Sequence, residues 1–507
     1  MRAGESNCVK LTRGVEMSIF GPTEGFAAAF PDFPTDLYIG GQWRPAASGR
    51  RIDVFDPSTG RRITSIADAS VEEGIAAVDA AHGAARSWAA TAPRIRGEIL
   101  RRAYELMRER AEWFAELIAL ENGKSLADAR GETLYAAEFF RWYAEEAVRV
   151  VGDLAVAPAG GNRMLVHYQP IGVSVLVTPW NFPAAMATRK IGPALASGCT
   201  CVLKPATETP LTAYALAALL REAGVPDGVV NVVTTSKSGP LVSAMLHDPR
   251  VRKLSFTGST EVGRILLAEA AAQVVSCSME LGGNAPFIVF DDADHEAAIE
   301  GAMIAKMRNG GEACTAANRF YVQRASVDRF ARALAARMEA LVVGDARRGD
   351  TQLGPLINGA ARDKVEELVQ DALARGARLL AGGGAVPDEG YYCSPTVLVD
   401  VPHDARVLHE EIFGPVAAIV AFDTEDEAIE LANRTEYGLV AYLYTGDLAR
   451  GLRVSERLET GMVGLNRGLV SDPAAPFGGV KQSGLGREGG HHGLLEFMEA
   501  KYIATQW

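Results

Sequence analysis

Three side chains in this sequence could together carry out thioester chemistry on a carbonyl: the thiol of Cys314, the carboxylate of Glu280 and the amide of Asn181. Cys314 lies in the glycine-marked run 309–315, and a thiolate is an effective nucleophile. Glu280 precedes a double glycine, where the backbone can approach a ligand closely and a glutamate can act as a general base. Asn181 lies between two prolines and offers an amide donor of the kind that oxyanion sites use.

Cys314 has no histidine near it in the sequence. The nearest of the eight histidines is His295, so a papain-like Cys-His hydrolase has no local support. A single cysteine is often a small buried hydrophobe, and Cys199, Cys201 and Cys277 are interpreted in that way because they lie in apolar, strand-like runs. The motifs that surround Cys314 favour the nucleophile instead.

Two arginines could select an anionic substrate. Arg189 lies in a mainly apolar predicted helix, and Arg308 lies six residues before Cys314. A guanidinium in such surroundings requires an anionic or hydrogen-bonding partner. For Arg308 this partner is either Glu312 on its own segment or the distal carboxylate of a substrate whose aldehyde reaches Cys314.

A nucleotide site is indicated where the strand-like run 253–256 continues into Thr257-Gly258-Ser259-Thr260-Glu261-Val262-Gly263 and then into a helical pattern. A glycine turn that opens a helix presents backbone N–H groups and the positive end of the helix dipole to a pyrophosphate. The spacing is not G-x-G-x-x-G, so an ordinary tight turn is the alternative. Lys204, which ends a buried strand before Pro205, either reaches solvent or binds ribose hydroxyls.

The elements that must position these residues follow an alternating α/β pattern without repeats. Four apolar strand runs are separated by helical patterns, which predicts a parallel sheet with helices on both faces. These runs are 173–177, 200–203, 229–233 and 253–256. Upstream, Ser70 and Glu73 have the spacing of a capping box at the start of a helix. A second α/β block begins near Asn284.

Two segments are expected to lie outside these blocks. Residues 148–157 and 164–169 are predicted to form a hairpin around a polar linker. Residues 1–33 mix Gly, Pro, Ala and Ser without apolar periodicity, so they are predicted to form a mobile or dispensable arm, and Met17 is an alternative start.

Bulk properties indicate a globular enzyme that acts on small molecules. The chain has 507 residues, a length typical of about three domains. Its formal net charge of −12 disfavours a binder of nucleic acids or of anionic membranes. No apolar stretch approaches the ~18 residues that a transmembrane helix needs, and no signal-peptide pattern is present. The six cysteines lack paired spacings, so neither disulfides nor a metal site is predicted, and the cytoplasm is the expected compartment.

From about Leu37 to its C-terminus the chain resembles the aldehyde dehydrogenase superfamily, with motifs in the order found there. These motifs are Pro179-Trp180-Asn181, Lys204-Pro205, Phe256-Thr257-Gly258-Ser259, Glu280-Leu281-Gly282-Gly283, Cys314, Glu411-Ile412-Phe413-Gly414-Pro415 and Pro476-Phe477-Gly478-Gly479. Within the superfamily the chain is most similar to succinate-semialdehyde dehydrogenases, through residues 186–190, 308–309, 317–319 and 481–487.

The resemblance implies an α/β, aldehyde-dehydrogenase-like fold. A Rossmann-type cofactor domain would comprise residues 34–147 and 171–283, and a catalytic domain residues 284–489. Residues 148–170 and 490–507 would be oligomerisation strands. The chain is then expected to form a homodimer or homotetramer, in which the hairpin pairs with residues 501–507 of another subunit.

The resemblance also implies a covalent mechanism with NAD or NADP as the cofactor. The Cys314 thiolate attacks an aldehyde, the Asn181 amide and the Cys314 backbone N–H hold the oxyanion, and hydride leaves to the nicotinamide. Glu280 then deprotonates the water that cleaves the thioester. Glu312 stands where the family usually has glutamine, and its side chain is expected to point away from the thiol.

The remaining site residues follow from the same likeness. Those assigned to the cofactor are Trp180, Lys204, Thr207, Gly258, Ser259, Gly263, Glu411 and Phe413, and those assigned to a substrate carboxylate are Arg189, Arg308 and Ser471. Many NAD-dependent members carry a glutamate at the position of Thr207, where it repels a 2′-phosphate. The neutral hydroxyl of Thr207 therefore favours NADP or dual use over strict NAD.

The expected reaction is oxidation of succinate semialdehyde to succinate. Glutarate semialdehyde stays open as the substrate because one methylene group discriminates by only ~1–3 kcal/mol, and another short aldehyde is a further alternative. A catalytically silent nucleotide-binding scaffold is an alternative of a different class. The joint presence of Cys314, Glu280 and Asn181 argues against it.

Overall fold

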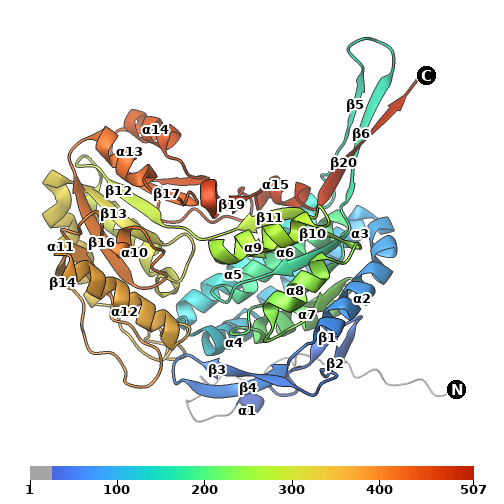
Figure 1. Ribbon diagram of the computed structural model, residues 1–507, viewed down its shortest axis with the longest axis horizontal. Coiled ribbons are helices and arrows are strands. Elements are labelled where there is room, and N and C mark those ends of the chain that lie inside the picture. Colours follow the sequence, from blue (N-terminus) through green and yellow to red (C-terminus); the bar gives the residue numbers. More distant parts are fainter. Residues whose placement is uncertain (1–25, 507) are drawn as a thin grey trace.

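The computed structural model describes residues 26–506, and Figure 1 shows two α/β lobes side by side with a long hairpin that projects from one of them. The predicted α/β class is confirmed. Sheets of eight and seven strands form the centres of the two lobes, and smaller sheets of three and two strands complete the strand pairing within residues 26–506.

The eight-stranded sheet belongs to the first lobe, and its five central strands are parallel, as predicted. In spatial order the strands are β19 (Gly484–Leu485), β11 (Ser276–Glu280), β10 (Val251–Thr257), β7 (Val173–Val177), β8 (Cys201–Lys204), β9 (Val230–Val232), β1 (Leu37–Ile39) and β2 (Gln42–Arg44). Strand β19 comes from the stretch expected in the catalytic domain, yet it pairs with β11.

Helices cover both faces of this sheet because successive side chains of a strand point to opposite sides. On one face Leu176 and Leu203 pack against one group of helices, and on the other Val175 and Val202 pack against a second group. The first group is α3 (Pro93–Glu109), α4 (Ala111–Asn122), α5 (Leu126–Glu146), α6 (Pro183–Ser197) and α7 (Leu211–Ala223). The second is α2 (Val71–Ala90), α8 (Ser238–Leu246) and α9 (Thr260–Ala271). Helix α2 begins with the predicted capping box of Ser70 and Glu73.

The seven-stranded sheet forms the second lobe and is parallel apart from its edge strand β14. Its strands are, in spatial order, β14 (Arg378–Ala381), β15 (Thr396–Val399), β16 (Val416–Phe422), β13 (Ala317–Gln323), β12 (Ala285–Val289), β17 (Val440–Tyr444) and β18 (Met462–Leu465). Helices α10 (His295–Met307) and α11 (Val327–Glu339) cover one face. The other face carries α12 (Gly359–Ala374), α13 (Glu425–Asn433) and α14 (Leu448–Arg457).

Short 3₁₀ turns and one short helix complete these lobes. They are η1 (Arg308–Gly311), η2 (Arg324–Ser326), η3 (Arg406–Leu408), η4 (Lys481–Ser483) and α15 (Gly490–Leu495). None of the helices in residues 26–506 combines the length and the apolar character that a membrane crossing requires.

The projecting hairpin in Figure 1 consists of β5 (Asp153–Val156) and β6 (Arg163–Pro170). The C-terminal strand β20 (Met498–Thr505) pairs with β6 of the same chain along its whole length, antiparallel, from Met498 opposite Pro170 to Thr505 opposite Arg163. From the sequence, this strand was expected on the hairpin of another subunit. The structure instead places it within the chain, because the short connection after α15 leads directly to β6.

Residues 26–33 belong to the packed body of the protein. They include α1 (Phe26–Ala29), and the rings of Phe30 and Phe33 lie 5.3 Å and 6.1 Å from the ring of Trp113. The prediction of a mobile arm over residues 1–33 therefore fails for this part, since the rings of Phe30 and Phe33 pack against Trp113 of α4. The rest of that prediction, with Met17, falls outside the described residues. A separate two-stranded sheet follows, formed by β3 (Arg51–Asp56) and β4 (Arg61–Ala67).

Candidate active site

The carboxyl ends of three neighbouring parallel strands bring the predicted site together. Asn181 follows β7, Gly258 follows β10, and Glu280 is the last residue of β11. Ligands of open α/β sheets bind at this edge. Cys314 comes from the other lobe, in the loop between η1 and β13, and reaches the same cavity.

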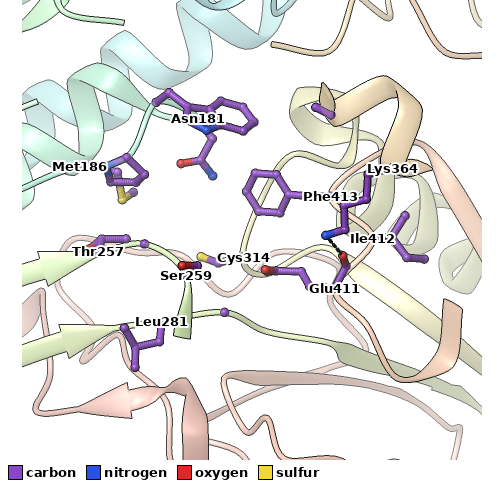
Figure 2. A pocket seen from close by; sticks show the side chains of 15 residues that line it. Asn181, Met186, Thr257, Ser259, Leu281, Cys314, Lys364, Glu411, Ile412 and Phe413 are labelled. Atoms are coloured by element: carbon purple, nitrogen blue, oxygen red, sulfur yellow. Dashed lines mark hydrogen bonds between the residues drawn. The ribbon is translucent and has the colours of Figure 1, made fainter. Parts of the chain in front are cut away.

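That cavity has a volume of about 270 Å³. Figure 2 shows the Cys314 thiol on one wall with the Asn181 amide across from it, and Phe413 and Glu411 at the side. The lining includes five residues that the sequence analysis assigned to the cofactor: Trp180, Gly258, Ser259, Glu411 and Phe413.

The loop that carries Cys314 is held close to both lobes by glycines. A Cβ on Gly283 would come within 2.4 Å of the Cys314 carbonyl oxygen, and one on Gly311 within 2.3 Å of the Gly414 carbonyl oxygen. Neither approach is compatible with a side chain. Burial raises the pKa of the Cys314 thiol to about 12, although the nearby charges of Arg189 and Arg308 oppose this. In the free protein the thiol is therefore protonated at neutral pH.

Asn181 is buried, and its backbone and side chain both have partners. Its Nδ2 donates to the Glu312 carbonyl oxygen at 2.9 Å, and its own carbonyl oxygen accepts from Lys124 Nζ at 2.6 Å and from Asn309 Nδ2 at 2.8 Å. An amide nitrogen has two hydrogens, so one remains for a ligand. Asn181 thus has a fixed backbone and a spare donor facing the cavity.

Glu280 is buried at the end of β11, and its Oε2 has no hydrogen-bond partner among the described residues. Burial, reinforced by the charge of Glu488, holds the pKa of Glu280 well above its usual range, against the opposing charges of Arg189 and Lys190. A Cβ on Gly478 would come within 2.7 Å of Glu280 Oε1. A glycine at 478 therefore leaves room for this carboxyl group.

Arg189 lies in α6 and is almost completely buried. Its guanidinium donates to Glu488 Oε2 at 3.4 Å and to the Tyr135 hydroxyl at 2.9 Å, and it lies 4.2 Å from the centre of the Phe477 ring. Lys190, the next residue, donates to the other oxygen of Glu488. The Arg189 Nε has no partner within the described part of the chain.

Arg308 is less buried and less engaged than Arg189. Its guanidinium lies 5.1 Å from the centre of the Phe182 ring, and within residues 26–506 its side chain forms no ion pair. The alternative partner Glu312 is turned away, as expected, and its Oε1 accepts from the backbone N–H of Ile357 at 3.1 Å. Burial accordingly holds the pKa of Glu312 well above its usual range. The third residue predicted to bind the substrate, Ser471, lies partly exposed in the loop after β18.

The cofactor side of the cavity is lined by aromatic rings and glycines. The rings of Trp180 and Phe413 meet edge to face with centroids 5.3 Å apart. Phe413 holds a left-handed backbone at φ 57°, a conformation that non-glycine residues adopt at a cost. Glu411 Oε1 accepts from the Gly283 N–H at 3.1 Å, and burial raises the pKa of Glu411 to about 7.

Three predicted cofactor residues lie away from this cavity. Gly263 packs its backbone on Leu281, where a Cβ would come within 2.4 Å of a leucine methyl group. Lys204 is buried at the end of β8, and burial lowers its pKa to about 8. Thr207 lines a separate cavity of about 240 Å³ together with Glu208, to which its hydroxyl donates at 3.2 Å.

The residues present fit a nicotinamide cofactor. Gly258 and Ser259 form the turn that opens α9, a helix whose N-terminus faces the cavity, and this arrangement suits a pyrophosphate. A Cβ on Gly282 would come within 3.2 Å of Glu411 Oε2, so a glycine at this position lets the Glu411 carboxylate pack against the backbone. Trp180 and Phe413 add apolar surface.

Several buried polar residues around the site were not predicted from the sequence. Lys124 and Glu132 form an ion pair of 2.5 Å beneath Asn181, and Glu488 links Arg189 with Lys190. Lys306 is fully buried, donates to Asn318 Oδ1 at 2.8 Å and has its pKa lowered to about 7 by burial. For Lys306, the only signal in the sequence is a lysine within an apolar predicted helix, and this signal does not identify Asn318 as its hydrogen-bond partner.

Comparison with known proteins agrees with this geometry. The sequence model described as "Aldehyde dehydrogenase family" matches residues 43–503. A succinate-semialdehyde dehydrogenase of Paenarthrobacter nicotinovorans is 55% identical over 441 residues, which is 87% of this chain and 98% of that protein. A glutarate-semialdehyde dehydrogenase of Pseudomonas putida is 49% identical over 471 residues, which is 93% of this chain and 98% of that protein. A crystal structure described as an Escherichia coli NADP-dependent enzyme superposes with a TM-score of 0.92 at 49% identity, and the match covers 94% of this chain and 98% of that one.

A doubly covered parallel sheet with a thiol near the carboxyl ends of its strands is an α/β arrangement that can hold a nucleotide beside a reactive cysteine. The chain belongs to the aldehyde dehydrogenase family. It is therefore an NAD(P)-dependent oxidoreductase with a small-molecule aldehyde as its substrate.

Proposed function

We propose that this enzyme oxidises succinate semialdehyde to succinate, with NADP favoured as the cofactor. The observation that carries the proposal is the pair of guanidinium groups of Arg189 and Arg308, both within electrostatic reach of Cys314. A four-carbon semialdehyde has its carboxylate at the opposite end from its aldehyde. A cation beside the nucleophile would therefore bind the carboxylate while the aldehyde carbon contacts the thiol.

The two arginines would contribute differently. Arg189 already shares its charge with Glu488 and Tyr135, so it is a fixed donor. Arg308 forms no ion pair in residues 26–506 and faces the Phe182 ring, so its charge is available to a ligand. We therefore assign the larger share of carboxylate binding to Arg308, with Ser471 as a further contact.

The covalent step would begin at Cys314. The sulfur attacks the aldehyde carbon, and the developing oxyanion accepts hydrogen bonds from the Asn181 amide and the Cys314 backbone N–H. Because the thiol is protonated in the free protein, its proton must leave. That proton would pass to water in the cavity, and Glu280, whose raised pKa makes its carboxylate a stronger base than an exposed glutamate, would act only in the later hydrolysis step.

A nicotinamide cofactor supplies the acceptor for the hydride when it is bound. The residues proposed to hold it are Gly258, Ser259, Trp180, Glu411 and Phe413, with Lys204 and Thr207 towards the adenosine end. Glu280 would then remove a proton from the water that attacks the thioester on Cys314. The unpartnered Oε2 of Glu280 suits this task because no hydrogen bond has to be broken first.

The lean towards NADP depends on Thr207. A neutral hydroxyl there is small and carries no negative charge, so it can accommodate a 2′-phosphate, which a glutamate would repel. Glu208 lines the same cavity, and its carboxylate accepts from the Thr207 hydroxyl. The crystal structure from Escherichia coli that is similar to this chain is described as NADP-dependent, which supports the same choice.

Glutarate semialdehyde is the second candidate substrate. The relative from Pseudomonas putida is named for it, and the arginine pair would suit either carboxylate. A catalytically silent scaffold is disfavoured because Cys314 and Asn181 line one cavity and Glu280 lies within electrostatic reach of the Cys314 sulfur.

We also propose that the enzyme is a cytoplasmic homodimer or homotetramer. The projecting hairpin exposes Leu154 at 65% and Val156 at 53%, and β20 exposes Tyr502 at 56%. These apolar side chains on a free three-stranded sheet suit burial against another copy. Light scattering on purified protein tests the proposal, and a monomer at micromolar concentration would refute it.

The substrate proposal is tested by initial rates of NADPH and NADH formation with succinate semialdehyde, glutarate semialdehyde and butanal. We expect kcat/KM to be highest for succinate semialdehyde with NADP, and at least about tenfold lower for butanal because one charge-assisted hydrogen bond contributes ~1.5–3 kcal/mol. Equal values for butanal and succinate semialdehyde would contradict a carboxylate clamp.

A further inference from the structure

A buried cluster of charged and amide groups lies directly beneath Asn181. The ammonium group of Lys124, in the turn between α4 and α5, lies 2.5 Å from Glu132 Oε2, and both side chains are completely inaccessible to solvent. The same ammonium group donates to the Asn181 carbonyl oxygen at 2.6 Å. An ion pair taken entirely out of water has a large desolvation cost and needs further hydrogen bonds to be tolerated. Here one of those hydrogen bonds goes from Lys124 to the backbone carbonyl group of Asn181, the proposed oxyanion donor.

The second oxygen of Glu132 extends the cluster to the start of α6. Glu132 Oε1 accepts from the backbone N–H groups of Ala184 at 2.9 Å and Ala185 at 3.2 Å. These are first-turn donors of α6, which have no partner inside the helix. Lys124 and Glu132 therefore hold both the carbonyl group of Asn181 and the helix that begins two residues later.

Asn309 connects the cluster with the loop of the nucleophile. Its Nδ2 donates to the Asn181 carbonyl oxygen at 2.8 Å and to the Glu312 carbonyl oxygen at 3.0 Å. Its backbone N–H donates to Asp128 Oδ2 at 2.9 Å, and Asn309 holds a left-handed backbone at φ 52°. The Asn181 carbonyl oxygen thus joins α5, the segment after β7 and the Cys314 loop.

We propose that Lys124 is a positioning residue of the reaction: it anchors the Asn181 carbonyl group and so orients the Asn181 side-chain amide towards the oxygen of an aldehyde bound at Cys314. The inference rests on the proposed function, in which Asn181 is an oxyanion donor. Donors of this kind must be set in place before the charge develops, and a displacement of about 1 Å can reduce a rate by about 100-fold.

Lys124 also contacts the ring that supports the substrate clamp. Its Nζ lies 4.0 Å from the centre of the Phe182 ring, which Arg308 faces at 5.1 Å. Loss of Lys124 therefore affects the substrate side as well, but the oxyanion is common to all aldehydes. The loss of kcat in a Lys124 variant should consequently be as large on butanal as on succinate semialdehyde.

The test is a double-mutant cycle of kcat with Asn181→Ala, Lys124→Met and the double variant, at saturating substrate and NADP. We expect Lys124→Met alone to lower kcat about 10- to 100-fold. Added to Asn181→Ala, it should lower kcat less than about threefold further, because the group that it orients is already gone. If the fold-loss of kcat in the double variant equals the product of the two single fold-losses, the inference is overturned.

Lys253→Met is the matched control for the loss of a buried lysine. Lys253 is fully buried in β10 and lies 3.0 Å from Glu496 and 3.3 Å from Ser276, away from Asn181. Whatever the size of its effect, the fold-loss of kcat in the double variant Lys253→Met with Asn181→Ala should equal the product of the two single fold-losses. If it also fails to multiply, the coupling of Lys124 is not specific and the inference falls.

Two further outcomes separate this inference from the proposed function. If Lys124→Met does not fold, because Glu132 is left with an uncompensated charge, the pair Lys124→Met and Glu132→Gln replaces it in the same cycle, with the same criterion. Near-normal kcat for Asn181→Ala would refute Asn181 as the oxyanion donor, and the inference with it. A large effect of Asn181→Ala with full multiplication refutes the positioning role alone.

Discussion

The two walls that meet at Cys314 are built in different ways. On the substrate side, Asn181, Arg189 and Glu280 are surrounded by buried charges, and hydrogen bonds already hold the first two. On the cofactor side, the rings of Trp180 and Phe413 meet each other beside glycine backbone, and the charged residues of the cavity lining are Glu411 and Lys364. The difference indicates that the proposed catalytic groups are positioned in advance, whereas the cofactor side leaves open surface for a large flat ligand.

The comparison predicts that chemistry and cofactor binding can be separated, and Cys314→Ala tests this most severely. Without the thiol no thioester forms, so kcat should fall by at least about 10⁴-fold. The Kd for NADP, measured by quenching of tryptophan fluorescence, should change less than about threefold. Loss of NADP binding in this variant would mean that the two walls are not independent.

Glu280→Gln should separate two chemical steps on the substrate side. The amide cannot take a proton from water, so steady-state turnover should fall by about 10²–10⁴-fold. Rapid mixing should still give a burst of NADPH, since the oxidation step precedes hydrolysis. A slowed first turnover without any burst would contradict the role given to Glu280 in hydrolysis.

The protonated thiol of the free protein predicts a pH dependence. Because burial places the Cys314 pKa near 12, the thiolate fraction grows about tenfold for each pH unit below that value. Alkylation of Cys314 by iodoacetamide, followed by mass spectrometry of its peptide, should therefore accelerate about 100-fold from pH 7 to pH 9. A plateau in this range would show that the pKa of the thiol is low in the free protein.

Thr207→Glu addresses the cofactor side and has the smallest expected effect. A carboxylate at this partly exposed position should repel the 2′-phosphate and lower the ratio of kcat/KM for NADP over NAD by about tenfold. Thr207→Gln is the matched control of equal size without charge. An unchanged ratio in the glutamate variant would place the choice of cofactor elsewhere.

Local patterns in the sequence predicted the scaffold well. The apolar runs that became β7, β8, β9 and β10 were recognisable because strands buried on both faces are apolar throughout. The capping box at Ser70 was recognisable because its two partners lie three residues apart. Cys314 and Asn181 were brought together correctly because each lies in a distinctive glycine or proline context.

The supports of the site could not be predicted in this way. Lys124 and Asn181 are 57 residues apart, and Lys190 and Glu488 are 298 apart, so no short-range pattern joins them. The pairing of β20 with β6 of its own chain depends on where α15 ends in space, which the alternation of side chains does not encode. The contact of Phe30 and Phe33 with Trp113 likewise forms only in the folded protein, because these residues are far apart in the sequence.

The central claim is that a cation beside Cys314 recognises a carboxylate, and Arg308→Ala tests it most directly. Arg308 is a cleaner choice than Arg189, because removal of Arg189 would also uncover the buried Glu488. We predict a loss of ~10–150-fold in kcat/KM on succinate semialdehyde, a loss below about threefold on butanal, and partial recovery with Arg308→Lys, whose point charge cannot reproduce a bidentate fork. Equal losses on the two aldehydes would contradict the account, since Arg308 would then support the fold or the cofactor and not the substrate.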